Sequence, residues 1–426
     1  MIYASQHGFL PENSATENRI AMQALLDRGG TIVVDRPGVY DIDAELRIGS
    51  YTTLEFENGA AVRKVPANGK FAYAIVNKGA LEKRWDEHII VRGMKVLVNN
   101  VAGNTPVPGL RGQLAFHYVR DLLLEDIRIP DLEPAQFGIH ICTFEDVIVR
   151  NCIITGKKDG IHLGRGKRFT ISNCVFDTFD DAVALNAHDY DSSNPELGWI
   201  EDGIVEKCWD INPEHAVGFF CRILAGAWVD WYEGMQVQKS DTVVSNGRLY
   251  RVFANPDGTM YTSVTRPEFK SGRQVLDGIT WQMVQEDVTY EAGVRNVTFR
   301  DIWLQKPRTA FSVHFDHDVW SRSFYPGAKN PLQENICFEN VRVQYDNPDC
   351  AFIHAVTPID SMTLTNCSLR GNPIVFRNPA KLDDPGETKL TLVGCSDTTG
   401  NMKDLIRNRV DGKVIRVSID GQSFNC

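Results

Sequence analysis

Three aspartates in the segment 157–187 are the residues of this chain best suited to acid–base chemistry. Asp159 stands 21 residues before Asp180 and 22 before Asp181. If that interval is one turn of a coil, the three carboxyl groups become neighbours, and their repulsion raises the pKa of at least one of them. A protonated carboxyl beside an ionised one is the arrangement that cleaves glycosidic bonds.

The same three residues allow other interpretations. Aspartates stacked at the turns of a solenoid also cap backbone amides or bind a structural cation, and this alternative stays open. Inverting cleavage requires two carboxyl groups roughly 6.5–9.5 Å apart, so that a water molecule fits opposite the leaving group. The spacing therefore has to be judged from the elements that position the aspartates.

Those elements follow an internal repeat of six residues. It occurs nine times; in nearly every copy positions one, three and six are apolar, and the fifth is often Asn or Asp, where a strand would turn. Such alternation is typical of short β-strands. The copies end at Met94, Ile127, Cys152, Cys174, Cys208, Ile302, Val341, Cys367 and Cys395. Apart from one interval of 94 residues before Ile302, they lie 22 to 39 residues apart, which predicts an all-β solenoid of short parallel strands.

The repeat places the aspartates in register. Counting forward from the last residue of three successive copies superposes the tetrads KDGI, DDAV and EHAV. Asp159, Asp181 and His215 should then stack at one corner of adjacent coils, about 4.8 Å apart, with Asp180 beside them.

Two further segments complete the predicted architecture. Ser14 and Glu17 fit a capping box that starts a helix, which we expect to cover the open end of the coil. Its apolar face is expected to hold Ile20, Ala21, Ala24 and Leu25. The long interval predicts a small antiparallel β module at 228–288, inserted into one β-helix domain made of 1–227 and 289–426. The aromatic residues of this module either form its core or bind sugar rings, because its frame is similar to small chitin-binding-type or phage-tail-type modules.

The coil pattern, together with the segment NSATENRIAMQALLDRGGTIVVDRPGVYDI, resembles the pectin-lyase-like superfamily of right-handed parallel β-helices. Within it, Asp-Gly, then Asp-Asp, then a His on the next coil resembles glycoside hydrolase family 28, the polygalacturonases. The resemblance implies that Asp180 is the general acid and that Asp159 and Asp181 hold and deprotonate the attacking water. His215 would orient or tune the acid.

This chain departs from the family pattern at several positions. The Asn-Thr that precedes the family's Asp-Gly is Lys157-Lys158 here, and Gly-His-Gly is Glu-His-Ala. The Arg-Ile-Lys that grips a substrate carboxylate is absent, with Ser-Val-His in its place, so Arg222 is the substitute that we consider. The expected substrate-binding residues are Lys158, His162, His188, Arg222, His314, Trp228 and Trp231. For His162, which matches His140 on the preceding coil, a purely structural role stays open.

Three functions follow from these observations. The first is an inverting glycoside hydrolase that acts on a polysaccharide or oligosaccharide, either pectin-like or another uronic-acid or neutral glycan. The second is a polysaccharide lyase on the same fold, for which Lys158 beside Asp159 could supply the base. The third is a non-catalytic glycan-binding or tail-spike-like protein, which the inserted module favours.

Composition narrows the partners. The net charge of −10 argues against nucleic acid, and no run of apolar residues is long enough to span a membrane. We expect no cofactor and no metal, and we expect the five cysteines that end copies of the repeat to form an internal stack of small side chains. No signal peptide is visible, which predicts a cytoplasmic protein; a leader ahead of Met1 would instead make it secreted or periplasmic.

Overall fold

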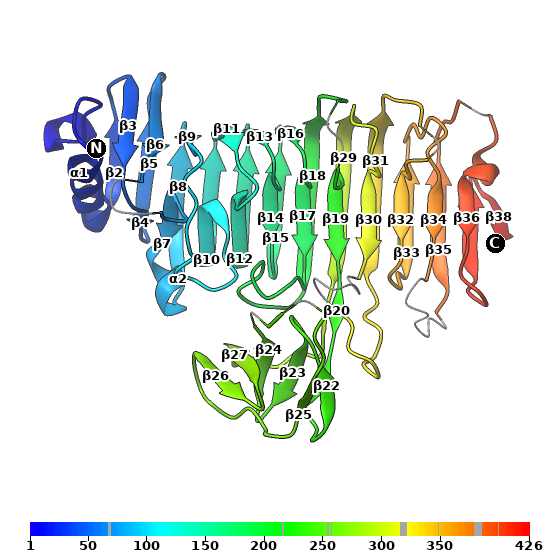
Figure 1. Cartoon of the computed structure of the whole chain (residues 1–426). Helices are drawn as coiled ribbons and strands as arrows, with labels where there is room; N and C mark the ends of the chain where they lie inside the picture. Colours follow the sequence, from blue (N-terminus) through cyan, green and yellow to red (C-terminus); the bar gives the residue numbers. More distant parts are fainter. Residues whose placement is uncertain are drawn as a thin grey trace.

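The chain winds into a right-handed parallel β-helix with three faces (Figure 1). The architecture comes from a computed structural model that describes residues 1–66, 70–214, 217–253, 255–256, 258–315, 322–347, 349–378, 386–398 and 400–426. Each coil runs through the first face, the second and the third in turn, and neighbouring coils pair in parallel. The predicted fold class is therefore confirmed.

Most strands lie entirely within a single one of the three faces. The first face contains β4 (Leu46–Ile48), β7 (Ile75–Asn77), β14 (Ile161–Leu163), β17 (Val183–Asn186), β19 (Cys221–Leu224), β30 (Phe311–His314), β32 (Ile353–Ala355), β34 (Ile374–Phe376) and β36 (Ile406–Asn408). The second face contains β1 (Ile2–Tyr3), β2 (Gly30–Val34), β5 (Thr52–Phe56), β8 (Asp86–Arg92), β15 (Gly166–Ser172), β33 (Ser361–Thr365), β35 (Thr388–Val393), β37 (Ile415–Ile419) and β38 (Gln422–Asn425). The third face contains β3 (Gly38–Ile42), β6 (Ala60–Lys64), β9 (Lys95–Leu97), β11 (Arg128–Leu132), β13 (Ile153–Gly156) and β16 (Val175–Thr178).

Longer strands bend from one face into the next. Those that join the first and second faces are β10 (Gly112–Glu125) and β12 (Phe137–Arg150). Those that join the second and third faces are β18 (Ile200–Asp210), β29 (Val294–Leu304) and β31 (Glu334–Val343).

The nine copies of the repeat stack on one another as expected. For example, Cys208 pairs with Ile302, and Ile302 pairs with Val341. The fifth residue of every copy has a positive φ, between 51° and 71°. Asn, Asp and Gly tolerate this left-handed conformation better than other residues, which explains why they fill eight of the nine positions; Lys207 is the exception.

The inward side chains of the coils form one continuous core. Cys152, Cys174 and Cys208 are buried in a row, and each thiol donates to the carbonyl two residues before it at 3.2–3.3 Å. Farther along, Phe299, Phe311, Phe338 and Phe352 pack as a ladder of rings with centroids 4.6–6.1 Å apart. The small thiols and large rings fill the narrow interior that the three sheets enclose.

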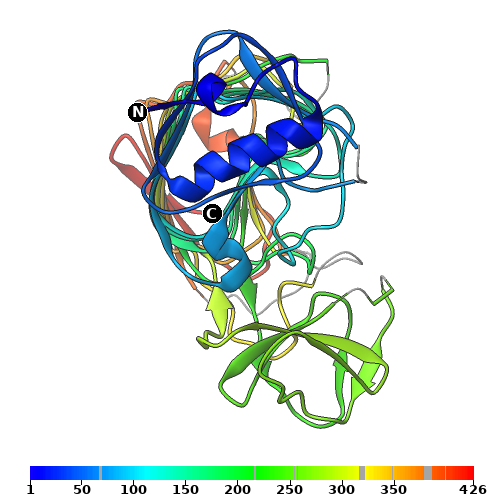
Figure 2. The same cartoon turned by 90° about the vertical axis from the view of Figure 1, so that its left-hand side faces the viewer.

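Helix α1 (Ala15–Arg28) crosses the amino-terminal end of the coil (Figure 2). Ser14 and Glu17 form the predicted capping box. The predicted apolar face is partly wrong: Leu25 is buried as expected, but Ile20 is 56% exposed. The other residues that the helix buries are Asn18, Met22 and Leu26. The remaining helices are short: α2 (Lys78–Glu82) and the 3₁₀ turns η1 (Ala4–His7) and η2 (Met402–Leu405). Within the described residues, no helix is long and apolar enough to cross a bilayer.

The segment between β19 and β29 leaves the coil and forms separate small sheets beside it (Figure 1). A stem of β20 (Gly226–Ala227) and β28 (Glu291–Ala292) joins it to the coil. Its main sheet contains β21 (Val229–Asp230), β23 (Thr242–Ser245), β24 (Arg248–Val252), β27 (Ile279–Gln285) and β26 (Arg273–Leu276), and a second sheet pairs β22 (Met235–Val237) with β25 (Tyr261–Ser263). All its pairings are antiparallel except β21 with β23. We call residues 226–292 the inserted module.

Candidate active site

Asp159, Asp180 and Asp181 lie together at the corner between the third and first faces. Asp159 precedes β14, and the adjacent pair precedes β17 on the next coil. Ile161 pairs with Val183, and the Gly160 amide donates to the Asp181 carbonyl at 2.9 Å, so Asp159 and Asp181 are in register. One carboxylate oxygen of each aspartate lies within 4.8 Å of the other two. The predicted convergence of the three aspartates is what the structure displays.

Cationic side chains surround this cluster. Lys158 contacts Asp180 directly and places its ammonium 3.7 Å from Asp159 Oδ1. Arg222 Nε lies 3.3 Å from Asp181 Oδ2. Arg222 belongs to the row of side chains that points outward from the first face, next to the cluster.

Histidine and backbone groups complete the contacts of the two buried aspartates. His162 Nδ1 lies 3.0 Å from Asp159 Oδ2, and the Phe219 amide donates to Asp181 Oδ1 at 2.9 Å. The other oxygen of Asp159, Oδ1, accepts no hydrogen bond within the described residues.

Arg308 fixes the backbone at the corner that carries the aspartates. Its guanidinium donates to the Asp180 carbonyl at 2.7 Å and to the Val217 carbonyl at 2.8 Å, and it forms a buried pair with Asp210 at 2.8 Å. Because Arg308 is only 4% exposed, this arrangement resists rearrangement. The acidic side chains are consequently presented by a rigid support.

The pKa values of the three carboxyl groups are driven apart. Burial by itself would raise the pKa of Asp159, but the charges of Lys158 and His162 outweigh it and the pKa lies well below the ordinary value. Burial and the charge of Asp159 raise the pKa of Asp180. Burial raises the pKa of Asp181 well above its ordinary value despite Arg222. One carboxyl group with a lowered pKa therefore adjoins two whose pKa values are raised.

Access to the cluster is from one side. The side chain of Asp180 is 29% exposed and those of Lys158 and Arg222 are 18% exposed, whereas Asp159 and Asp181 are buried. Beside this edge, a cavity of about 510 Å³ is lined by Lys157, Phe179 and the third face. A large ligand can reach Asp180 directly, and the other two aspartates only through a small molecule such as water.

The outer surface of the first face is covered above the cluster. The loop 187–199 folds over it, and Arg251 of the inserted module donates to the carbonyls of Asp189, Asp191 and Asn194 at 2.6–3.4 Å. Asp189, buried in this loop, lies 3.3 Å from Arg222 and 3.8 Å from His162 Nε2. The module therefore helps to position residues that contact the aspartates.

His215 lies outside the described residues, and the register around it corrects one prediction. Val183 pairs with Cys221, so the position equivalent to Asp159 and Asp181 on the next coil is Phe219. The turn after β18 is four residues longer than the two preceding turns, which the alignment of tetrads did not allow for. The described tetrad that lies in register with KDGI and DDAV is GFFC, residues 218–221.

Three of the expected substrate-binding residues belong to the module junction instead. His188 is 1% exposed, with Nε2 3.3 Å from Thr242. Trp228 and Trp231 are 2% and 7% exposed, and their indole groups donate to the Thr289 carbonyl and the Ser263 hydroxyl. The expectation that these residues bind substrate is wrong, because their side chains are buried where the module packs.

His314 lies farther along the first face than the aspartates. It pairs in register with Leu224, while Ser312 pairs with Arg222. Its Nδ1 lies 2.9 Å from the Ser312 hydroxyl, and its ring packs near Phe219 at 5.9 Å. His314 thus borders the cluster through its neighbours.

The sequence did not reveal the roles of Phe137 and Arg308, and it indicated Asp189 only as part of a loop that could wall the groove. Phe137 stacks on His162 at 4.2 Å, and Lys158 Nζ lies 5.7 Å from its centroid. These residues come from another coil, from the covering loop and from a later turn. A faint signal existed for Asp189 only, which follows the strand of Asp180 and Asp181 in the segment LNAHDYD.

The three aspartates are also the one group within the described residues whose ligand atoms are close enough together to bind a metal ion. Lys158 and Arg222 already contact the same carboxylates. A divalent cation would have to compete with both positive charges, so the donor set does not favour a metal centre.

Neither a protein-family model nor a curated protein matches this chain. Among solved structures, the family 28 exopolygalacturonase of Yersinia enterocolitica matches with a TM-score of 0.50 and 12% identity, over 99% of this chain and 79% of that one. The N-terminal fragment of bacteriophage Phi29 gene product 12 matches with a TM-score of 0.50 and 11% identity, over 99% and 73%. These likenesses show the fold, a right-handed parallel β-helix.

Proposed function

We propose that this protein is a glycoside hydrolase, and that Asp159, Asp180 and Asp181 catalyse the cleavage of a polysaccharide or oligosaccharide. The observation that carries the proposal is the division of pKa values among three clustered carboxyl groups, one lowered and two raised. Such a division distinguishes the carboxyl groups suited to act as an acid from the one suited to act as a base. The fold supports a carbohydrate-active protein in general, and the cluster supports hydrolysis in particular.

Asp180 is the general acid in this mechanism. It is the most exposed of the three side chains and its pKa is raised, so it can reach a glycosidic oxygen and donate a proton to it. Lys158, in contact with Asp180, then stabilises the carboxylate that remains after proton transfer.

Asp159 and Asp181 hold the attacking water. Hydrogen bonds of about 2.7–2.8 Å let one water bridge two oxygens that lie within 4.8 Å of each other. Asp159, whose lowered pKa keeps it ionised, receives the proton of this water as the bond to the sugar forms. Arg222, beside Asp181, is placed to bind a hydroxyl or carboxylate of the substrate.

The stereochemical outcome follows from how far apart the acid and the water lie. Inversion requires that a water held between Asp159 and Asp181 attack from the side opposite Asp180. The nearest oxygens of the cluster are closer than the roughly 6.5–9.5 Å typical of inverting pairs, a distance measured between whole carboxyl groups. Proton NMR of the first sugar released decides between inversion and retention.

A lyase mechanism based on Lys158 is disfavoured by its environment. Burial would lower the pKa of Lys158, but the charges of Asp159 and Asp180 outweigh it and the pKa is raised. A base that removes a carbon-bound proton must be neutral at working pH, and this ammonium is held in its charged form.

Non-catalytic glycan binding is the second candidate function. It is favoured by the burial of Asp159 and Asp181 beneath the covering loop, since charges that are paired and covered can serve structure alone. In that case the aspartates stiffen the corner and no bond is broken.

Product analysis separates these functions. The wild-type protein is incubated with a panel of plant-wall, microbial and host glycans, and new reducing ends and ultraviolet-absorbing unsaturated ends are measured. Hydrolysis predicts reducing ends without unsaturation, and their loss in Asp180→Asn. Unsaturated products would establish a lyase, and the absence of products from every glycan would support binding alone.

A further inference from the structure

A second polar groove lies at the corner between the first and second faces, beside the inserted module. It encloses about 360 Å³ and is lined by Trp85, Glu145, Arg165, Trp199, Glu201 and Asp287. None of these residues takes part in the proposed hydrolysis, and the groove lies at a different corner from the aspartate cluster. Its function therefore has to be derived from its own lining.

Two tryptophans give the groove its apolar surface. Trp85 is 38% exposed, and Arg120 lies over its ring at 4.4 Å from the centroid. Trp199 is partly exposed, and Arg295 lies over its ring at 4.9 Å. Broad aromatic surfaces held in place by guanidinium groups are suited to stacking against flat, partly apolar rings.

The polar lining consists mainly of carboxylates that solvent reaches. The side chains of Glu145, Glu201 and Asp287 are 29%, 27% and 65% exposed. Carboxylate oxygens accept hydrogen bonds from hydroxyl groups, and a pair of vicinal hydroxyls fits one carboxylate. Each of these carboxylates is already paired with a cation: Glu145 with Lys167 at 3.3 Å, Glu201 with Arg295 at 2.7 Å and Asp287 with Arg165 at 2.6 Å. The groove therefore carries little net charge and favours a neutral ligand rich in hydroxyl groups.

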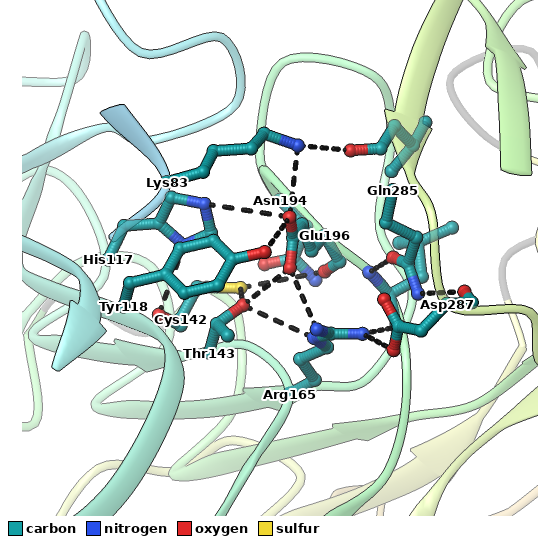
Figure 3. A network of polar contacts seen from close by, with 12 residues as sticks. Lys83, His117, Tyr118, Cys142, Thr143, Arg165, Asn194, Glu196, Gln285 and Asp287 are labelled. Carbon is teal, nitrogen blue, oxygen red and sulfur yellow. Dashed lines mark hydrogen bonds and ion pairs between the residues drawn. The ribbon is translucent and has the colours of Figure 1, made fainter. Parts of the chain in front are cut away.

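The floor of the groove is rigid because a buried network fixes Arg165 (Figure 3). Arg165 pairs with the buried carboxylate of Glu196 at 2.9 Å and with Asp287 of the module at 2.6 Å. Glu196 also accepts from Tyr118 at 2.8 Å and Lys83 at 3.0 Å. A floor that is already ordered loses little entropy when a ligand binds.

The groove runs along the coil axis. Val119, Phe144, Gly166 and Ile200 are register partners on four successive coils, so three strand spacings, about 14 Å, separate the first from the last. Trp85 packs on Tyr118 at one end, and Trp199 adjoins Ile200 at the other. The two platforms are therefore far enough apart to contact different rings of one chain.

We infer that this groove binds a neutral linear oligosaccharide that lies along the coil axis, with Trp85 and Trp199 stacking on separate sugar rings and the carboxylates accepting from its hydroxyls. The site would retain a glycan chain on the protein whether or not the aspartate cluster cleaves it. Binding in the groove does not depend on the proposed hydrolysis.

The test measures binding of immobilised neutral hexasaccharides from glucans, mannans, xylans and chitin to full-length Asp180→Asn, which prevents turnover. We expect one or more of them to bind and Trp85→Ala and Trp199→Ala each to weaken that binding about tenfold or more. Trp85→Phe, which keeps an aromatic platform, should retain most of it. Tyr51→Ala, which removes another exposed ring, should change nothing.

Circular dichroism and thermal unfolding check that each variant is folded. If Trp85→Ala folds poorly, Asp287→Asn provides a second probe. Because the Asp287 side chain is mostly exposed, this substitution should weaken glycan binding without affecting folding. Failure of all neutral hexasaccharides to bind overturns the inference, as does unaltered binding by folded Trp85→Ala and Trp199→Ala. Either result leaves the proposed hydrolysis intact, because that proposal is judged by reducing-end release.

Discussion

Two buried acidic sites in this molecule solve the same electrostatic problem in opposite ways. Glu196 is one carboxylate that accepts from Lys83, Tyr118 and Thr143 and pairs with Arg165 at 2.9 Å (Figure 3). Burial would raise its pKa, yet the surrounding charges lower the pKa to about 2. The site is saturated with donors and joins the coil to the inserted module.

The aspartate cluster, by contrast, brings three carboxylates together. Asp159 Oδ1 accepts no hydrogen bond within the described part of the chain, and Asp180 and Asp181 have raised pKa values. Unsatisfied charge of this kind costs stability and is retained where chemistry needs it. The comparison separates a carboxylate that stabilises the fold from a group of carboxylates that opposes folding.

Asp180→Asn is the change with the largest expected effect. Loss of the general acid should lower turnover by about 10³-fold. Stability should stay unchanged or rise by up to about 1 kcal/mol at pH 7, because a carboxyl group with a raised pKa opposes folding when it is ionised. Initial rates and urea unfolding of the same preparation measure both quantities.

The matched control is Asp202→Asn at an exposed turn, where a positive φ of 57° suits asparagine. It should leave both rate and stability unchanged. A clear loss of stability in Asp180→Asn would mean that the cluster is structural in the same sense as Glu196.

Glu196→Gln should have the next largest effect, and on stability instead of chemistry. Removing the charge leaves Arg165 and Lys83 without their buried partner, which should cost about 2–4 kcal/mol of unfolding free energy. Urea unfolding followed by circular dichroism measures the loss. A change below about 0.5 kcal/mol, typical of surface ion pairs, would contradict the role given to Glu196.

The third prediction concerns how the difference in stability between the wild type and Glu196→Gln depends on pH. The folded-state pKa of Glu196, about 2, lies below its ordinary value of 4.5, so its contribution is fully present above pH 4.5 and is lost as pH falls toward 2. Wild-type and Glu196→Gln proteins should therefore converge in stability over that range. A gap that stays constant down to pH 2 would rule out the ionised carboxylate as its source.

Arg222→Lys should have a smaller effect. Arg222 lies 3.3 Å from both Asp181 and Asp189, and a lysine ammonium cannot contact both with the same geometry. We expect turnover on the best substrate to fall about tenfold with little change in unfolding midpoint. Full activity in Arg222→Lys would show that the bridge to Asp189 does not matter.

Removal of metal should have no effect. Lys158 and Arg222 supply the positive charge at the cluster, so dialysis against a chelator should leave the rate unchanged. A rate that falls with chelator and returns with calcium or magnesium would replace the acid–base assignment with a metal-dependent one.

The fold was predictable from sequence because its signal repeats. Nine copies of one strand pattern fix nine coils, and the turn residues at their fifth positions, such as Asn151 and Asn173, mark where each coil bends. The stacking of Asp159 and Asp181 followed from the same register. Both conclusions follow from strands that stack on equivalent strands, and neither depends on a contact between a strand and a different kind of element.

The incorrect predictions arose where the structure depends on the length of a turn or on contacts between residues far apart in the sequence. The turn before Phe219 is four residues longer than its predecessors, which misplaced His215 in the alignment. Trp228 and Trp231 are enclosed by the module, and no local pattern distinguishes an enclosed tryptophan from an exposed one. Glu196 went unnoticed because its partners come from coils as much as 113 residues away.

The most direct test of the account is a carboxyl titration by NMR with ¹³C-labelled aspartate, assigned by Asn substitution at each of the three positions. The account predicts that at least one aspartate of the cluster titrates well above 3.8 in the wild type and that Asp159→Asn brings this titration down. Titration of all three aspartates at or below 3.8, unaffected by Asp159→Asn, would contradict it.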